Sequence, residues 1–195
     1  MKIEKNIEVE LRALIDEEQF IELNCFLAKN GKYLGEDHKD SHFFILPDKL
    51  LKVTDNISKN NAKISLKLQK IGLGSDFEEI DVNFYREDAD KIIKIFKLLG
   101  FTNHMYSYQN RHNYLYKNIE FAIKYTQSWG FHCEMEIMVN SKKEVPNALK
   151  EMGVVAKELG LKIMSDDELK VFIEKIRAGW NRGAYTKEEI KSKKL

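Results

Sequence analysis

The strongest constraint on the fold is a stretch of alternating apolar and charged residues near the start of the chain, Ile7-Glu8-Val9-Glu10-Leu11-Arg12-Ala13. Successive side chains of a β-strand point to opposite faces, so this stretch predicts a strand with one apolar and one charged face. The carboxylates of Glu8 and Glu10 would lie roughly 7 Å apart and repel each other unless a cation lies close to them. The run Glu134-Met135-Glu136 repeats the pattern. Two such pairs could converge on a divalent metal such as Mg²⁺, which prefers oxygen ligands; the alternative is a solvated sheet face with scattered charge.

This alternation recurs along most of the chain and predicts a protein rich in strands. Strands are expected over residues 3–14, 32–46, 50–54, 63–71, 77–84, 101–117, 119–126 and 131–139. Apolar residues at helical spacing, with capping residues at the ends, predict helices between Asp16 and Gly31 and over residues 86–99, 142–159 and 166–178. Most connections between strands are short, which favours antiparallel pairing, so the expected fold class is α+β.

The charged faces of these strands carry an acidic set and a basic set. The acidic residues are Glu8, Glu10, Glu79, Asp81, Glu134 and Glu136, and the basic residues are Arg12, Lys52, Lys67, Arg111 and Lys124. An open sheet could cover one face with helices and leave the charged face in water. A closed barrel would instead place both sets inside, with the helices packed against its outer surface. Such an interior would bind a polyanion through its basic groups and divalent cations through its acidic groups.

Composition narrows the classes of partner. The chain has 32 basic and 31 acidic residues and a net charge of +1. We do not expect a nucleic-acid partner, because proteins that bind nucleic acids are usually strongly basic. We expect no membrane association, because no apolar run approaches the ~18 residues that a membrane span requires. The first residues lack the apolar segment of a signal peptide. We therefore expect a cytoplasmic protein whose cysteines, Cys25 and Cys133, are reduced thiols in the core.

Several short motifs match a known family in their order and spacing. They are Glu8-Val-Glu10-Leu-Arg12, Leu51-Lys52, Ile64-Ser-Leu-Lys67, Glu79-Ile-Asp81, Leu99-Gly100-Phe101, Gln109-Asn110-Arg111 and Gly130-Phe-His-Cys-Glu134-Met-Glu136. Over residues 3–176 the chain resembles the CYTH family, the triphosphate tunnel metalloenzymes, which include class IV adenylyl cyclases and thiamine triphosphatases. The resemblance implies a closed antiparallel barrel of eight strands, the tunnel, with flanking helices. This domain would span residues 1–178, followed by a basic C-terminal tail over residues 179–195.

The resemblance also implies a function and the residues that perform it. The triphosphate would be bound by Arg12, Lys52, Lys67, Arg111 and Lys124, with Arg12 and Lys67 as the catalytic residues. The cofactor, Mg²⁺ or Mn²⁺, would be bound by Glu8, Glu10, Glu134 and Glu136. The first expectation is metal-dependent hydrolysis of inorganic triphosphate, a nucleoside triphosphate or thiamine triphosphate. The second is conversion of ATP to cyclic AMP and pyrophosphate, in which a ribose hydroxyl replaces water as the nucleophile.

One position departs from the family. Lys124 stands where the family has a metal-binding aspartate, ten residues before Glu134. A lysine here is expected to form an ion pair with Glu134 or Glu136 and to compete with the metal. A third expectation is therefore a binding module that holds a phosphorylated ligand without turning it over. The sequence leaves open the choice among the three functions, the metal, and whether the chain forms a homodimer.

Overall fold

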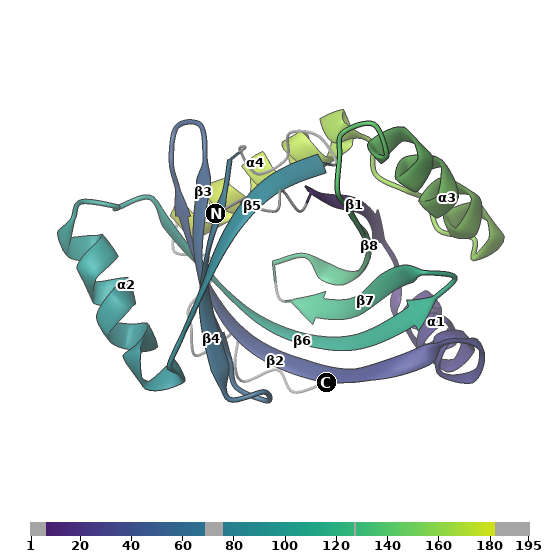
Figure 1. Ribbon diagram of the computed structural model, residues 1–195, viewed down its shortest axis with the longest axis horizontal. Helices are drawn as coiled ribbons and strands as arrows, with labels where there is room; N and C mark the ends of the chain where they lie inside the picture. The colour runs from purple at the N-terminus through teal and green to yellow at the C-terminus, as the bar shows by residue number, and fades with distance from the viewer. Residues whose placement is uncertain (1–6, 69–75, 127, 182–195) are drawn as a thin grey trace.

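Eight antiparallel strands form a single sheet that curls around on itself, with helices packed around it (Figure 1). The computed structural model describes residues 7–68, 76–126 and 128–181. The strands are β1 (Ile7–Leu14), β2 (Lys32–Ile45), β3 (Leu50–Asn56), β4 (Asn61–Lys67), β5 (Asp76–Phe84), β6 (His104–Tyr116), β7 (Ile119–Thr126) and β8 (Gly130–Val139). The helices are α1 (Glu17–Asn30), α2 (Ala89–Leu98), α3 (Val145–Glu158) and α4 (Asp166–Asn181), with a 3₁₀ turn, η1 (Arg86–Asp88), before α2. The predicted α+β class is confirmed.

The strands pair in the order β1-β5-β4-β3-β2-β6-β7-β8, and β8 pairs in turn with β1. Each strand therefore has two paired neighbours. The β1–β8 ladder runs the whole length of β1, whereas the β1–β5 ladder is short and joins residues 7–9 to residues 76–78. In β2 the pairing with β6 shifts between Tyr33 and Gly35. Gly35 has a φ of +102°, a value that favours glycine, so it suits this irregular position in a long, curved strand.

The apolar side of the sheet faces outward, against the helices, in two clusters. The larger cluster lies beneath α1 and α3 and includes Val9, Leu27 and Met152, none of which is exposed. The smaller cluster lies beneath α2, which packs on the side of the barrel away from α1 and α3 in Figure 1, and it includes Phe44 and Ile93. Packing of the helices on the outer face leaves the charged side chains of the strands on the inner face.

Helix boundaries follow the capping residues, with small departures from prediction. Asp16 caps α1: its carboxylate accepts a hydrogen bond from the Gln19 N–H, and the Gln19 side chain accepts one from the Asp16 N–H. The expected helix over residues 86–99 instead begins with η1. Helix α4 continues to Asn181, so the domain boundary predicted after residue 178 falls within a helix. Residues 182–195 of the predicted basic tail lie outside the described residues.

One expectation about the cysteines is wrong. Cys133 is buried as expected, but Cys25 is exposed. The buried residues of α1 are Leu23 and Leu27, and a residue midway between them points to the opposite side of the helix. Among the described residues, no helix combines the length and the apolar character needed to cross a membrane.

Candidate functional site

A cavity of about 260 Å³ lies inside the curled sheet, and every strand contributes side chains to its wall. All of the site residues predicted from the sequence line this cavity: Glu8, Glu10, Arg12, Lys52, Lys67, Arg111, Lys124, Glu134 and Glu136. Their common orientation follows from strand geometry, since residues two apart in a strand share a face. The structure thus brings residues from distant parts of the chain into one charged interior, at the positions that the alternation predicts.

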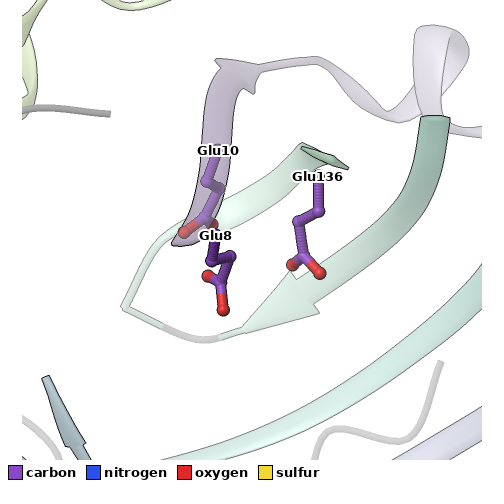
Figure 2. A group of neighbouring side chains, drawn as sticks. All are labelled: Glu8, Glu10 and Glu136. Atoms are coloured by element: carbon purple, nitrogen blue, oxygen red, sulfur yellow. The ribbon is translucent and has the colours of Figure 1, made fainter. Parts of the chain in front are cut away.

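Three glutamates form an acidic cluster on one side of the cavity. Glu8 and Glu10 come from β1, Glu136 comes from β8, and Figure 2 shows their carboxylates gathered around one space. One oxygen from each lies within 4.8 Å of the others. The cluster arises from strand register, because Glu10 and Glu136 are directly opposite each other across the β1–β8 ladder.

Burial raises the pKa of Glu10 well above its ordinary value, although Arg12 opposes the shift. Burial also raises the pKa of Glu136, with Arg111 opposing and Glu8 contributing in the same direction. The protein alone therefore does not fully compensate the negative charge of this cluster. Arg12 pairs with Glu10 and Lys67 pairs with Glu8, so the negative charge of the cluster is compensated only in part. Three hard oxygen donors with a remaining negative charge fit the requirements of a divalent metal ion.

Glu134 is the fourth predicted acidic ligand, but its surroundings differ from those of the other three. It forms an ion pair with Lys124, whose side chain is only 4% exposed, and its Oε1 lies 3.6 Å from Nε of Arg12. Burial would raise the pKa of Glu134, but Lys124 and then Arg12 lower it well below its ordinary value. The expectation that Lys124 pairs with Glu134 or Glu136 is confirmed at Glu134. This carboxylate is thus neutralised by the protein's own cations.

Lys67 lies between the acidic cluster and the opposite wall. Its Nζ is 3.0 Å from Oε1 of Glu8 and 3.5 Å from Oε2 of Glu79. Burial would lower the pKa of Lys67, but Glu8, Glu10 and Glu79 together raise it above its ordinary value. Lys67 therefore remains charged at neutral pH and faces the same space as the carboxylates.

The opposite wall is rich in cations and contains polar atoms without partners. Lys52 lines it, and burial together with the nearby charge of Lys67 lowers the pKa of Lys52. Two buried oxygens of residues that line the cavity, Oγ1 of Thr54 on β3 and Oε1 of Glu79 on β5, have no hydrogen-bond partner among the described residues. Buried polar atoms normally have partners, so these oxygens indicate that the cavity receives a polar ligand or water.

Arg111 completes the basic side of the cavity from β6. Its Nε donates a hydrogen bond to Oδ1 of Asn113 at 2.5 Å and lies 3.8 Å from Oδ2 of Asp37. Asp37 is almost fully buried and accepts further hydrogen bonds from Asn56 and Asn113. The guanidinium is thus held in place by neighbouring polar side chains.

Sequence reasoning missed several residues of this interior. His132 lies two residues before Glu134 on the same face of β8, so the alternation could have identified it. Burial and the charge of Lys124 lower the pKa of His132 to about 4, so it is neutral at pH 7. Trp129 also lines the cavity and packs against His132 and Phe172, at ring-centroid distances of 5.1 and 4.9 Å.

Lys39 was missed for a different reason. It lines the cavity from β2, a strand in which both faces carry polar residues, so the alternation gives no signal there. Asp37, two residues earlier on the same face, was missed for the same reason. Neither residue belongs to the motifs that carry the family resemblance.

Comparisons with known proteins agree with this architecture. A 23% identical Pyrococcus horikoshii protein, PH1012, has a structure with a TM-score of 0.63, covering 80% of this chain and 91% of that one. The Hippeastrum protein HpAC1, for which a dominant triphosphatase activity is described, is 15% identical with a TM-score of 0.55 over 81% of this chain and 89% of that one. The triphosphatase of the Mimivirus capping enzyme is 15% identical with a TM-score of 0.53 over 78% and 89%. At these identities the likeness concerns the fold alone.

A search among curated proteins found no match to this sequence. The family model of the CYTH domain, by contrast, matches residues 6–168, which is most of the chain. The matched range contains every motif on which the resemblance was based, and the fold and the charged interior agree with it. The chain belongs to the CYTH domain family.

Proposed function

We propose that this protein binds a triphosphate-containing substrate inside the barrel and hydrolyses it with the help of a divalent metal ion. The observation that carries the proposal is the division of the cavity into an acidic cluster on β1 and β8 and a cationic wall on β3, β4 and β6. A polyphosphate chain needs cations along its length, and a metal ion bound to it needs carboxylates. One cavity offers both.

The basic residues would act on the phosphate oxygens. Lys52 and Lys67 would interact with them as point charges, and Arg111 could donate two parallel hydrogen bonds. Lys67 and Arg12 lie beside the acidic cluster, where the metal-bound part of the substrate would be. Their charges would stabilise the negative charge of the phosphoryl group as it is transferred, and they are the candidate catalytic residues.

Glu8, Glu10 and Glu136 fit a Mg²⁺ or Mn²⁺ ion. When bound, such an ion would neutralise phosphate oxygens and help to orient the substrate. Glu134 is a weaker candidate ligand, because Lys124 and Arg12 already neutralise it. Its role in the protein as described is to hold these two cations in place.

Two other functions remain alternatives. The ion pair of Lys124 with Glu134 favours a binding module, because it reduces the number of carboxylates free for a metal. An adenylyl cyclase would use the same cavity with a ribose hydroxyl as the nucleophile. Hydrolysis is ranked first because it requires only a positioned water in addition to the charges described.

Product analysis separates these functions. The protein is incubated with inorganic triphosphate, ATP or thiamine triphosphate and with Mg²⁺ or Mn²⁺, and the products are identified by chromatography. Phosphate release supports hydrolysis, cyclic AMP indicates a cyclase, and binding without product indicates a binding module. Lys67→Met should abolish most of the activity, whereas Lys117→Met, at an exposed ion pair with Glu158, should not. Absence of both binding and products would overturn the proposal.

A further inference from the structure

The β2 side of the cavity holds a group of charges of which the proposed function uses only Arg111. Lys39 lines the cavity, and its Nζ lies 3.0 Å from Oδ2 of Asp37. Lys59 pairs with the other oxygen of the same carboxylate, at 2.9 Å, but it is half exposed and does not line the cavity. Arg111 lies 3.8 Å from Oδ2 of Asp37. Three cations therefore share one buried carboxylate.

This arrangement leaves excess positive charge facing the cavity. Asp37 can balance only one of its three cations. Lys124 also lies near Lys39, but its own charge is paired with Glu134. Gln109, directly opposite Lys39 in the β2–β6 ladder, also lines the cavity and contributes no charge. An anion that enters the cavity would find Lys39 and Arg111 on one wall, with Asp37 behind them.

Lys39 is also sensitive to its surroundings. Burial lowers the pKa of Lys39 to about 7, with Arg111 and Lys124 acting in the same direction and Asp37 opposing them. In the free protein this side chain therefore titrates near neutral pH, where an ordinary lysine stays charged. A polyanion nearby would favour the charged form.

We propose that Lys39 is a further anion-binding residue of the tunnel, held ready by Asp37, and that it takes up a proton when a polyphosphate binds. The inference rests on the proposed function, since it concerns the same ligand in the same cavity. It assigns Lys39 a distinct role: affinity for the polyphosphate depends on pH near neutrality through this side chain. Lys59 has no such role, although it shares the carboxylate of Asp37.

The test is calorimetric titration with imidotriphosphate, a triphosphate analogue that resists hydrolysis, in the presence of Mg²⁺ at pH 6.5 and 8.5. The proteins are the wild type, Lys39→Gln, Lys39→Arg and the matched control Lys59→Gln. At pH 6.5 Lys39→Gln should bind roughly ten- to hundred-fold more weakly, the usual effect of losing a hydrogen bond to a charged group. Lys59→Gln should bind as the wild type does.

The pH dependence gives a second readout. Above pH 7 the affinity of the wild type should fall by up to about tenfold per pH unit relative to Lys39→Arg, whose guanidinium stays charged. Titrations at pH 8 in buffers of different ionisation enthalpy should show uptake of up to one more proton by the wild type than by Lys39→Arg. Both proteins have the same charged groups around position 39, namely Asp37 on β2, Arg111 on β6 and Lys124 on β7. The ligand also titrates in the same way with both, so the difference between them reports on the side chain at position 39.

The outcomes separate this inference from the proposed function. A wild type that does not bind the analogue overturns both. A wild type that binds it, with Lys39→Gln equally tight and the same pH dependence in Lys39→Arg, overturns only the role of Lys39. Thermal melts establish that each variant is folded, and the comparison between the wild type and Lys39→Arg decides the question if Lys39→Gln does not fold.

Discussion

Replacement of Lys124 tests how the protein balances charge at the acidic side of the tunnel. Lys124 and Glu134 form a buried pair, with side chains 4% and 14% exposed. Removal of one partner from a buried pair costs about 3–5 kcal/mol, because it leaves an uncompensated charge. Arg12 still lies 3.6 Å from Glu134, so we place Lys124→Met at the lower end, about 3 kcal/mol. In a chain of this size that corresponds to a fall in Tm of about 6–12 °C.

Lys124→Asp should have a larger effect in the absence of metal and should respond to metal differently. It adds a carboxylate beside four others, which places the cost at about 5 kcal/mol and the fall in Tm at about 10–20 °C. It also removes the competing cation and supplies another oxygen ligand. At a Mn²⁺ concentration about a hundred times the dissociation constant, binding should return about 2.7 kcal/mol, or about 5–11 °C.

The assay is thermal unfolding in EDTA and across a Mn²⁺ series, with calorimetric titration for affinity and stoichiometry. The wild type should bind Mn²⁺ more weakly than Lys124→Asp, with Lys124→Met between them. Lys117→Asp is the charge-matched control, because its partner Glu158 is exposed and remote from the tunnel. Equal or weaker Mn²⁺ affinity in Lys124→Asp than in the wild type, with the fold intact, would show that Lys124 does not occupy a metal position.

Three further outcomes are expected. Met152→Ala should lower the free energy of unfolding by about 2–5 kcal/mol in urea titrations, because the Met152 side chain on α3 is fully buried against the sheet. Val154→Ala, at an exposed position of the same helix, should change the free energy of unfolding little. Equal effects of the two substitutions would contradict the packing described. Burial would raise the pKa of Asp37, but Lys39 and the surrounding hydrogen bonds lower this pKa well below its ordinary value. The ionised Asp37 carboxylate therefore stabilises the fold at pH values above the ordinary carboxyl pKa. This stabilisation is lost as the pH falls below the ordinary carboxyl pKa. Asp37→Asn should therefore melt at a lower temperature than the wild type at pH 7, with a difference that shrinks toward pH 2; a constant difference would contradict this. Lys67→Met should reduce the rate of triphosphate hydrolysis by roughly 10²–10³, as expected for removal of a group that stabilises the transition state, and an unchanged rate in a phosphate-release assay would exclude a catalytic role.

The inward-facing residues could be predicted because strand alternation is a local property. Arg12 and Glu134 each lie two residues, and Lys67 lies four residues, from another side chain of their strand that lines the cavity, so the short motifs were sufficient to place them on one face. The apolar residues on the opposite face require helices to cover them. Together these two features indicate a charged interior rather than a charged exterior.

The residues that pair with these side chains across neighbouring strands could not be predicted in the same way. Arg12 faces Glu134 because of the register between β1 and β8, which joins segments far apart in the sequence. Lys39 was missed because β2 is polar on both faces: Asp40, on its outer face, accepts a hydrogen bond from the Tyr106 hydroxyl. A polar residue on the outer face removes the contrast on which alternation depends.

The central claim is that one cavity binds a polyphosphate on its cationic wall and a metal ion on its acidic cluster. The most direct measurement is a crystal structure of the protein soaked with imidotriphosphate and Mn²⁺, with anomalous scattering recorded at the manganese edge. We predict a manganese peak among Glu8, Glu10 and Glu136, with the phosphate chain extending toward Lys52, Lys67 and Arg111. A manganese peak elsewhere, or a phosphate chain bound only outside the barrel, would contradict the account.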